Sequence, residues 1–287
     1  MPPPVADLTN CVLEEVDRRL PGGLTGLLLH GSLCWGEFFP GRYVDFVGLW
    51  ERPPRGGEVH LLRAAHEATR CRIGALAFDG FHCTPADLAA PPTRITHRPA
   101  FFEGTFDSAG TVDVHLVTWH ELAERGIAVR GAVPAVYTNL DELLDFTSAN
   151  LDTYWRGFIT TIEQAGIETA GEQDDTVTWI RLGSARLHHL LFTNELTSKS
   201  GAGRYVRDAL DPRWSRIARE ALRIREEPES ERPVRRSRPA GPGRLRVALL
   251  ACRRWLRRAA AFVKRGPLLD KRRVTVVGVV HRSAAYH

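Results

Sequence analysis

The chain has 287 residues, of which 43% are apolar and 25% are charged, a balance typical of globular proteins and not of disordered or fibrous ones. No apolar run reaches the roughly 20 residues that a membrane span requires. The first residues lack the basic start and apolar stretch of a signal peptide. The five cysteines have neither CxxC nor zinc-ligand spacing, so we expect reduced thiols in a cytoplasmic protein.

The net charge of +5 conceals two parts of opposite charge. Residues 231–287 carry 14 Arg and 2 Lys against one Glu and one Asp, a net charge of +14, whereas the first 230 residues carry 23 bases and 32 acids, a net charge of −9. The basic isoelectric point therefore comes from the tail, and we do not expect the acidic body to bind nucleic acid.

Helical and strand patterns alternate over the first half of the chain. Helical periods with a clear end signal predict helices over residues 5–20, 58–72 and 119–125. Apolar runs bounded by turn residues predict strands over 24–30, 44–50 and 74–83, and a weaker fourth strand over 112–117. The stretch 85–110 is rich in Pro, Gly, Thr and Ser and is expected to be mostly loop.

Only helical periods occur after about residue 139. They predict helices near 140–146 and 151–158, and over 177–192 and 204–225. The change of pattern indicates an N-terminal α/β domain with a mixed sheet over residues 1–135, an all-helical bundle over 136–227, and a basic, poorly ordered extension over 228–287.

Gly31 and Ser32 follow the first predicted strand directly and begin a short helical stretch that ends at Gly36. Backbone N–H groups at such a turn, with the positive end of a helix dipole, favour a phosphate. Most Gly-Ser turns only connect a strand to a helix. Asp45 and Asp79 lie in the second and third strand patterns, where an unpaired acid is costly to bury. They indicate a divalent cation or a basic partner, unless they lie at strand ends facing water.

Two separate sets of residues, one in each half of the chain, resemble one family. Leu28-Leu29-His30-Gly31-Ser32, followed by Arg42-Tyr43-Val44-Asp45-Phe46, resembles the signature of nucleotidyltransferases, in particular the aminoglycoside adenylyltransferases, in which a Gly-Ser turn precedes Ser-Asp-x-Asp on the next strand. The stretches 182–186, 193–199, 209–214 and 220–222 are similar to the C-terminal helical domain of that family. Together the resemblance covers about residues 1–227.

The resemblance implies adenylyl transfer from Mg-ATP to a hydroxyl of a small polar acceptor, an aminoglycoside at the level of the family, with pyrophosphate leaving. It assigns Mg²⁺ coordination to Asp45 and Asp79, and general-base catalysis to Asp79. We expect the protein to act as a monomer. The positions that match the family's phosphate contacts are Gly31, Ser32, Arg186 and Lys199.

A guanidinium fork and a mobile ammonium both suit phosphate oxygens. The alternative for Arg186 and Lys199 is a solvated helix face.

The first metal-binding Asp of the family is Tyr43 here, and the preceding Ser is Arg42. A phenol with a pKa near about 10 is a poor Mg²⁺ ligand at neutral pH. Loss of one metal-binding carboxylate corresponds to a rate lower by roughly 10² to 10⁴. Glu37, as a carboxylate, and Arg42, as a phosphate contact, are the candidates to compensate.

Three functions therefore compete. The first is a working nucleotidyltransferase with a reduced metal site, and the second is a non-catalytic homologue that binds a nucleotide or a small polar ligand. The third lies in the tail, where a basic and an apolar stripe would form an amphipathic helix that binds anionic membranes or nucleic acid. The basic stripe consists of Arg246, Arg253, Arg257 and Lys264.

Overall fold

The computed structural model describes residues 1–39, 43–74, 76–165, 174–210 and 212–227. Arg42 and the predicted basic extension with its amphipathic stripe lie outside these residues. Over the described ranges, no helix combines the length and the apolar character needed to cross a bilayer. The described cysteines, Cys11, Cys34, Cys71 and Cys83, are free thiols.

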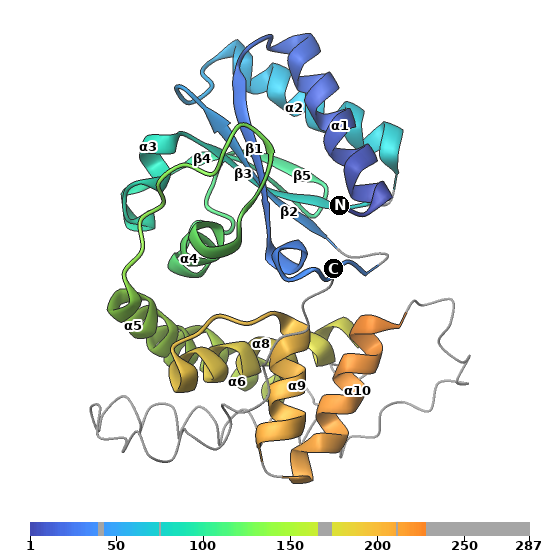
Figure 1. Ribbon diagram of the computed structural model, residues 1–287, viewed down its shortest axis with the longest axis vertical. Coiled ribbons are helices and arrows are strands. Elements are labelled where there is room, and N and C mark those ends of the chain that lie inside the picture. Colours follow the sequence, from blue (N-terminus) through green and yellow to red (C-terminus); the bar gives the residue numbers. More distant parts are fainter. Residues whose placement is uncertain (40–42, 75, 166–173, 211, 228–287) are drawn as a thin grey trace, which may run out of the picture.

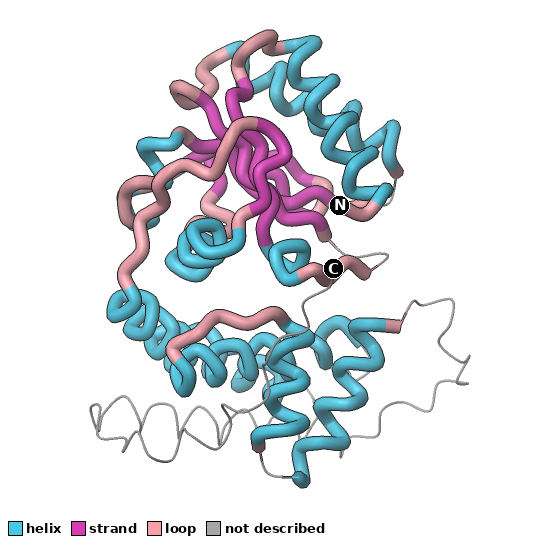
Figure 2. Tube along the Cα trace, viewed as in Figure 1, coloured by secondary structure: helices cyan, strands magenta, loops and turns pink. Residues whose placement is uncertain are grey.

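A mixed sheet of six strands occupies the centre of the N-terminal part, in the order β5-β4-β3-β2-β1-β6 (Figures 1 and 2). Strands β2 and β3 are parallel, and the other neighbouring pairs are antiparallel. The strands are β1 (Leu24–His30), β2 (Val44–Trp50), β3 (Phe78–Cys83), β4 (Arg98–Phe102), β5 (Thr105–Gly110) and β6 (Ile127–Arg130).

Helices cover the sheet and form the whole of the C-terminal part (Figure 1). The α-helices of the N-terminal part are α1 (Pro3–Arg19), α2 (Gly57–Ile73), α3 (Pro85–Leu88) and α4 (Leu116–Arg125). Those of the C-terminal part are α5 (Leu140–Asn150), α6 (Arg156–Ala165), α8 (Asp174–Thr193), α9 (Lys199–Ala209) and α10 (Ser215–Glu226). Shorter helical segments are η1 (Gly31–Trp35), η2 (Pro92–Arg94), the π-helical η3 (Leu151–Trp155) and η4 (Pro212–Trp214).

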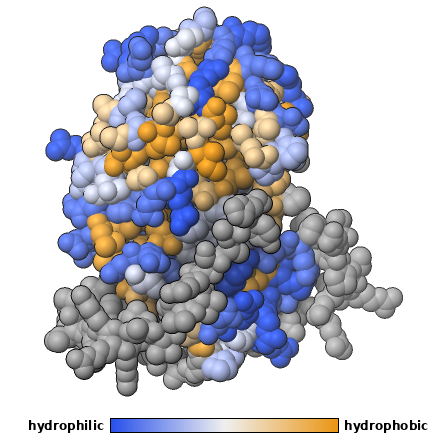
Figure 3. All heavy atoms as spheres, viewed as in Figure 1, coloured by the Kyte–Doolittle hydropathy of each residue, from blue (hydrophilic) through white to orange (hydrophobic). Residues whose placement is uncertain are grey.

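The two faces of the sheet have separate cores. Helices α1 and α2 cover one face, where Leu8 packs in the same cluster as Leu27 and Phe46. Helix α4 covers the other face, where Trp119 and Leu122 share a cluster with Leu28, Val47 and Phe81. On the side of the molecule drawn in Figure 3, hydrophilic residues lie along the outer rim at α1 and α2, and hydrophobic residues lie over the middle of the N-terminal part. Because both faces of β1 and β2 are covered, these strands are apolar without alternation, and the predicted ranges 24–30 and 44–50 are confirmed.

The prediction of a mostly irregular stretch over 85–110 is wrong. Strands β4 and β5 form a hairpin whose turn at Glu103 and Gly104 has φ values of 49° and 77°, the conformation that two-residue hairpin loops favour. Pro99 lies at a register shift between Arg98 and Ala100, where the missing backbone N–H disturbs the ladder least.

The weak strand predicted over 112–117 is also wrong. Asp113 adopts a left-handed φ of 57°, and His115 caps helix α4, because its Nδ1 accepts the N–H of Thr118 at 3.2 Å. The alternating apolar residues Val112 and Val114 therefore belong to a turn before a helix that begins at Leu116. In the helical part, the single helix predicted over 204–225 is two helices, α9 and α10, separated by η4.

Candidate functional site

The Gly-Ser turn after β1 is tighter than the sequence predicts. Segment η1 is a five-residue 3-10 helix that ends at Gly36, and not the start of an α-helix, so a helix dipole contributes little here. Gly31 has a φ of 64°, and a Cβ at this position would lie 1.8 Å from Oδ2 of Asp45. Only glycine therefore allows the turn to lie directly against the carboxylate of β2.

Asp45 and Asp79 are on the same face of the sheet. They are register partners on the parallel strands β2 and β3, and His30 is the partner of Asp45 on β1. These residues lie on the sheet face that α4 covers. Asp45 and Asp79 precede Val47 and Phe81 by two residues on their strands, and Val47 and Phe81 pack in the cluster under α4. Burial raises the pKa of Asp45, and the charges of Asp113 and Glu121 add to this, while His30 and Lys199 oppose it.

Asp79 is almost completely buried, with 2% of its surface exposed. Its Oδ1 accepts the backbone N–H of Glu103 at 3.0 Å, from the turn of the β4–β5 hairpin. Burial, supported by the negative charge of Asp45, raises the pKa of Asp79 to about 7 despite that hydrogen bond. Such a carboxyl exchanges a proton near neutral pH, as a general base must.

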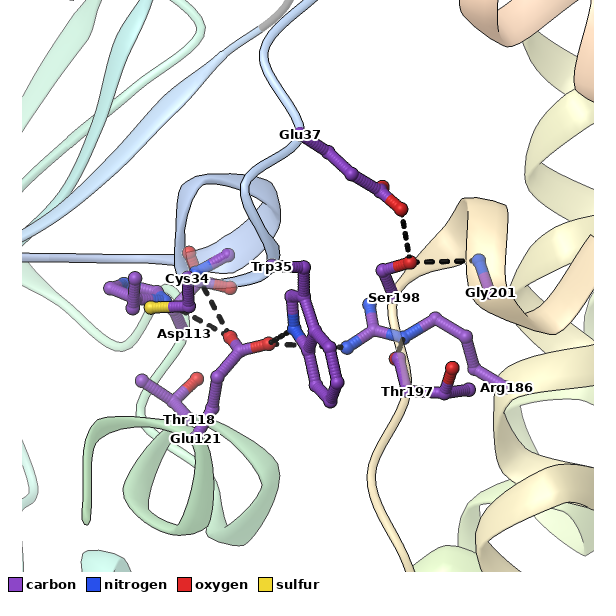
Figure 4. Close-up of polar contacts among 12 residues, drawn as sticks. Cys34, Trp35, Glu37, Asp113, Thr118, Glu121, Arg186, Thr197, Ser198 and Gly201 are labelled. Carbon is purple, nitrogen blue, oxygen red and sulfur yellow. Dashed lines mark hydrogen bonds and ion pairs between the residues drawn. The ribbon is translucent and has the colours of Figure 1, made fainter. Parts of the chain in front are cut away.

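Glu121 of α4 is a site residue that sequence reasoning missed. Its Oε2 accepts the N–H of Gly31 at 3.0 Å and its Oε1 accepts the indole N–H of Trp35 at 2.9 Å. Nδ1 of His30 lies 3.6 Å from Oε2, and Nη2 of Arg186 lies 3.9 Å from Oε1. Figure 4 shows dashed lines from the Glu121 carboxylate to both Trp35 and Arg186. A signal was available, because Glu121 lies among the buried residues Trp119 and Leu122 on an amphipathic helix.

The Gly31 amide is consequently occupied by a carboxylate of the same chain. Burial by itself would raise the pKa of Glu121, but the adjacent His30 imidazole, the charge of Arg186 and the Trp35 donor together lower it to about 2. The carboxylate therefore stays ionised at neutral pH. A phosphate at this turn must use other donors or replace Glu121 at Gly31.

Arg186 and Lys199 reach the same site from the helical part. Arg186 lies within α8, and its Nε donates a hydrogen bond to the carbonyl of Thr197 at 3.1 Å. This contact directs the guanidinium toward Glu121. Lys199 is the first residue of α9, and its charge lowers the pKa of Asp45. Both side chains line a cavity of about 130 Å³. The other lining residues are Gly31, Ser32, Trp35, Tyr43, Asp45, Glu121, Ser198 and Arg225.

Glu37 connects the same two parts of the chain beside the cavity. Its Oε1 accepts the hydroxyl of Ser198 at 2.6 Å (Figure 4). The same Oε1 lies 3.5 Å from Nη1 of Arg204, and Oε2 lies 3.8 Å from Nη2 of Arg225. Ser198 also caps α9, because its Oγ accepts the N–H of Gly201 at 2.8 Å. Glu37 is thus engaged by the helical part, and the expectation that it replaces the missing metal ligand is not supported. Arg42, the second candidate, lies outside the described residues.

Tyr43 lines the cavity at the position where the family motif has its first acid, and 46% of its surface is exposed. Among the described residues, no three His, Cys, Asp or Glu side chains form a group that could hold a metal ion. Asp45 lines the cavity, and Asp79 is its register partner on the next strand but does not line the cavity itself. Mg²⁺ commonly binds proteins through one or two carboxylates, the remaining ligands being water and substrate phosphate. Burial and neighbouring acids raise the pKa of both carboxyls, and a bound divalent cation would oppose that rise.

Comparison with known proteins gives a similar picture at the level of the fold. No family model matches the sequence, and no curated protein matches it either. Among solved structures, the chain is similar to spectinomycin adenyltransferase AAD(9) from Enterococcus faecialis, solved with ATP and spectinomycin. The TM-score is 0.61 at 12% identity, over 88% of this chain and 99% of that chain. The chain therefore has a nucleotidyltransferase fold, with a mixed-sheet α/β part followed by a helical part.

Proposed function

We propose that the chain transfers the adenylyl group of ATP to a hydroxyl of a small acceptor. One observation carries the proposal: a single cavity joins the Gly-Ser turn and Asp45 to Arg186 and Lys199 of the helical part. The similarity in fold to an adenyltransferase solved with ATP supports it. We also propose that the protein is a monomer and acts in the cytoplasm.

In this proposal the cationic side chains bind the triphosphate. Arg186 offers a planar fork and Lys199 a mobile point charge, and Ser32 adds a hydroxyl at the turn. Asp45 and Asp79 would hold Mg²⁺, which when bound neutralises charge that develops on the phosphate oxygens. A cation held there would offset the charge of Asp45, which together with burial raises the pKa of Asp79.

Asp79 is the proposed general base. The acceptor hydroxyl gives its proton to the Asp79 carboxylate while its oxygen forms a bond to the α-phosphorus of ATP. The bond between that phosphorus and the bridging oxygen breaks, and pyrophosphate leaves with the electron pair. The product is the adenylylated acceptor, and the proton on Asp79 returns to solvent.

A second candidate, a non-catalytic homologue that binds the nucleotide, is favoured by Tyr43. This phenol stands where a carboxylate would complete the cation site, and Glu121 already occupies the Gly31 amide. Both features weaken the groups that stabilise the transition state, but they leave Arg186 and Lys199 in the cavity. The tail-based function, by contrast, concerns residues outside the described part of the chain.

Calorimetric titration with ATP, in Mg²⁺ and in EDTA, together with an assay of pyrophosphate release, tests the proposal. We expect ATP binding that Mg²⁺ strengthens, and a Tyr43→Asp variant whose release rate is higher by roughly 10² to 10⁴. Tyr43→Phe is the matched control, because it removes the hydroxyl without adding a charge. If only Tyr43→Asp releases pyrophosphate, the native chain is the non-catalytic homologue of the second candidate. Absence of any effect of Mg²⁺ on either protein would refute the cation site.

A further inference from the structure

A second cavity, of about 270 Å³, adjoins the cavity at the Gly-Ser turn and shares Arg186 and Lys199 with it. It lies among α4, α5, η3, α8 and the segment before α9, and α5 and α8 are in contact. Because the two cavities meet at the proposed phosphate contacts, the second one is where an acceptor would lie next to a bound triphosphate. Its assignment to the acceptor therefore rests on the proposed function.

The walls of the second cavity are mostly aromatic and aliphatic. Phe146, Tyr154 and Trp155 supply three rings, and Leu187 and Leu190 of α8 supply aliphatic surface. Trp155 packs closely under the backbone of α8, since a Cβ at Gly183 would lie 2.5 Å from its ring. These side chains favour a ligand with a flat or alicyclic apolar body.

The charged groups that line this cavity are cationic. Within the part of the chain that the structure describes, its only charged lining residues are Arg186 and Lys199. Burial lowers the pKa of His115, so its imidazole is neutral near neutral pH. Uncharged polar groups of the lining residues include the amide of Asn150 and the hydroxyls of Tyr154 and Thr197. An acceptor with several ammonium groups would lose its hydration here and meet two cations in place of carboxylates.

We infer that the acceptor is an uncharged, one- or two-ring apolar molecule that carries a hydroxyl group, and not a polycationic aminoglycoside. The size of the cavity agrees with this, because it is slightly smaller than the roughly 300 Å³ at which pockets for drug-sized ligands begin. Asn150 and Thr197 provide the hydrogen bonds that orient such a molecule.

The test is a calorimetric titration of the full chain with 1-naphthol and with spectinomycin, at pH 7.5 and with or without ATP. We expect saturable binding of 1-naphthol at least about ten times tighter than binding of spectinomycin. Spectinomycin binding as tight as that of 1-naphthol would overturn the inference.

Asn150→Asp gives a sharper version, because it adds one negative charge to the wall with almost no change of shape. We expect it to shift the affinity ratio toward spectinomycin by about tenfold. The matched control is Asn194→Asp, on an exposed residue outside the cavity, which should leave both affinities unchanged. Equal affinities in the wild type and Asn150→Asp would show that neither probe binds in this cavity, and the inference would fail.

The arms of the experiment separate this inference from the function on which it rests. Binding of 1-naphthol without any binding of ATP would refute adenylyl transfer and leave the ligand class of the cavity supported. Binding of ATP without binding of 1-naphthol would refute the ligand class and leave adenylyl transfer supported.

Discussion

The sheet side and the helical side of the cavity differ in charge and in how their side chains are held. On the sheet side, strand register fixes Asp45, which lines the cavity, next to its partner Asp79, which does not line it, and Gly31 and Trp35 fix Glu121. On the helical side, the cations lie on α8, α9 and α10. Arg186 and Arg225 of that side lie close to the carboxylates of Glu121 and Glu37 on the sheet side.

The two parts of the chain are thus joined by the same charges that would bind a nucleotide. Carboxylates of the sheet side hold cations of the helical side in place. If the proposed function holds, a triphosphate in the cavity offers those cations another anion, and we expect its binding to be coupled to the contact between the two parts. Substitutions on one side at a time should separate the two roles of these charges.

Removal of the proposed base should have the largest effect. Asp79→Asn is expected to reduce turnover by roughly 10² to 10⁴, because an amide cannot accept the proton of the acceptor. Binding of ATP in EDTA should change by less than about threefold, since the proposal assigns Asp79 to the acceptor proton and to the cation and gives it no contact with the phosphates. Single-turnover assays with calorimetry separate the two quantities. Asp7→Asn, at an exposed position of α1, is the control, and turnover unchanged in Asp79→Asn would remove Asp79 from catalysis.

Truncation of the buried carboxylate should destabilise the fold. Glu121→Ala leaves the Gly31 amide and the Trp35 indole without an acceptor and His30 without its counter-charge. We expect the free energy of unfolding to fall by about 3 to 5 kcal/mol, measured by urea denaturation. Glu124→Ala, at an exposed position one residue before the end of the same helix, should change it by less than about 0.5 kcal/mol. Equal effects of the two variants on the free energy of unfolding would mean that the contacts of Glu121 do not stabilise the fold.

Loss of one helical-side cation should weaken nucleotide binding. Arg186→Gln is expected to raise the Kd for ATP by about 10- to 100-fold, the usual effect of one charge-assisted contact to phosphate. Arg219→Gln changes an exposed arginine of α10 outside the cavity and should leave the Kd unchanged. If Arg186→Gln binds ATP as the wild type does, the phosphates lie elsewhere.

The pH dependence of stability gives the smallest effect. The folded-state pKa of Asp79, about 7, is above its ordinary value of 3.8, so the folded protein binds this proton more tightly than the unfolded chain. The stability that the folded protein gains from binding this proton is fully present below about pH 4 and is lost as the pH rises to 7. The free energy of unfolding of Asp79→Asn, taken relative to that of the wild type, should therefore rise by about 1 to 3 kcal/mol between pH 4 and pH 8. Urea denaturation at both pH values measures the gain, and parallel pH profiles of the two proteins would contradict it.

Local sequence signals were sufficient for part of the fold. The apolar runs of β1 and β2 and the helical periods of α1 and α2 depend on neighbours along the chain, and their predicted positions are close to the observed ones. The hairpin of β4 and β5 was missed because Pro99 and Gly104 usually indicate loops, yet here they occupy a register shift and a tight turn. The start of α4 was missed because a histidine side chain caps it.

The sequence alone showed that two predicted strands each carry one Asp among apolar residues, and that a Gly-Ser pair follows the strand before them. It also showed that a later helical region carries Arg186 and Lys199. Which groups meet at the site depends on the packing of the folded chain. Gly31 and Glu121 are 90 residues apart, and Glu37 and Ser198 are 161 residues apart. Contacts at such separations leave no periodic pattern, because they depend on strand order and on how α4 and α9 pack. For the same physical reason, the sequence did not reveal that a carboxylate of the chain itself occupies the turn amide.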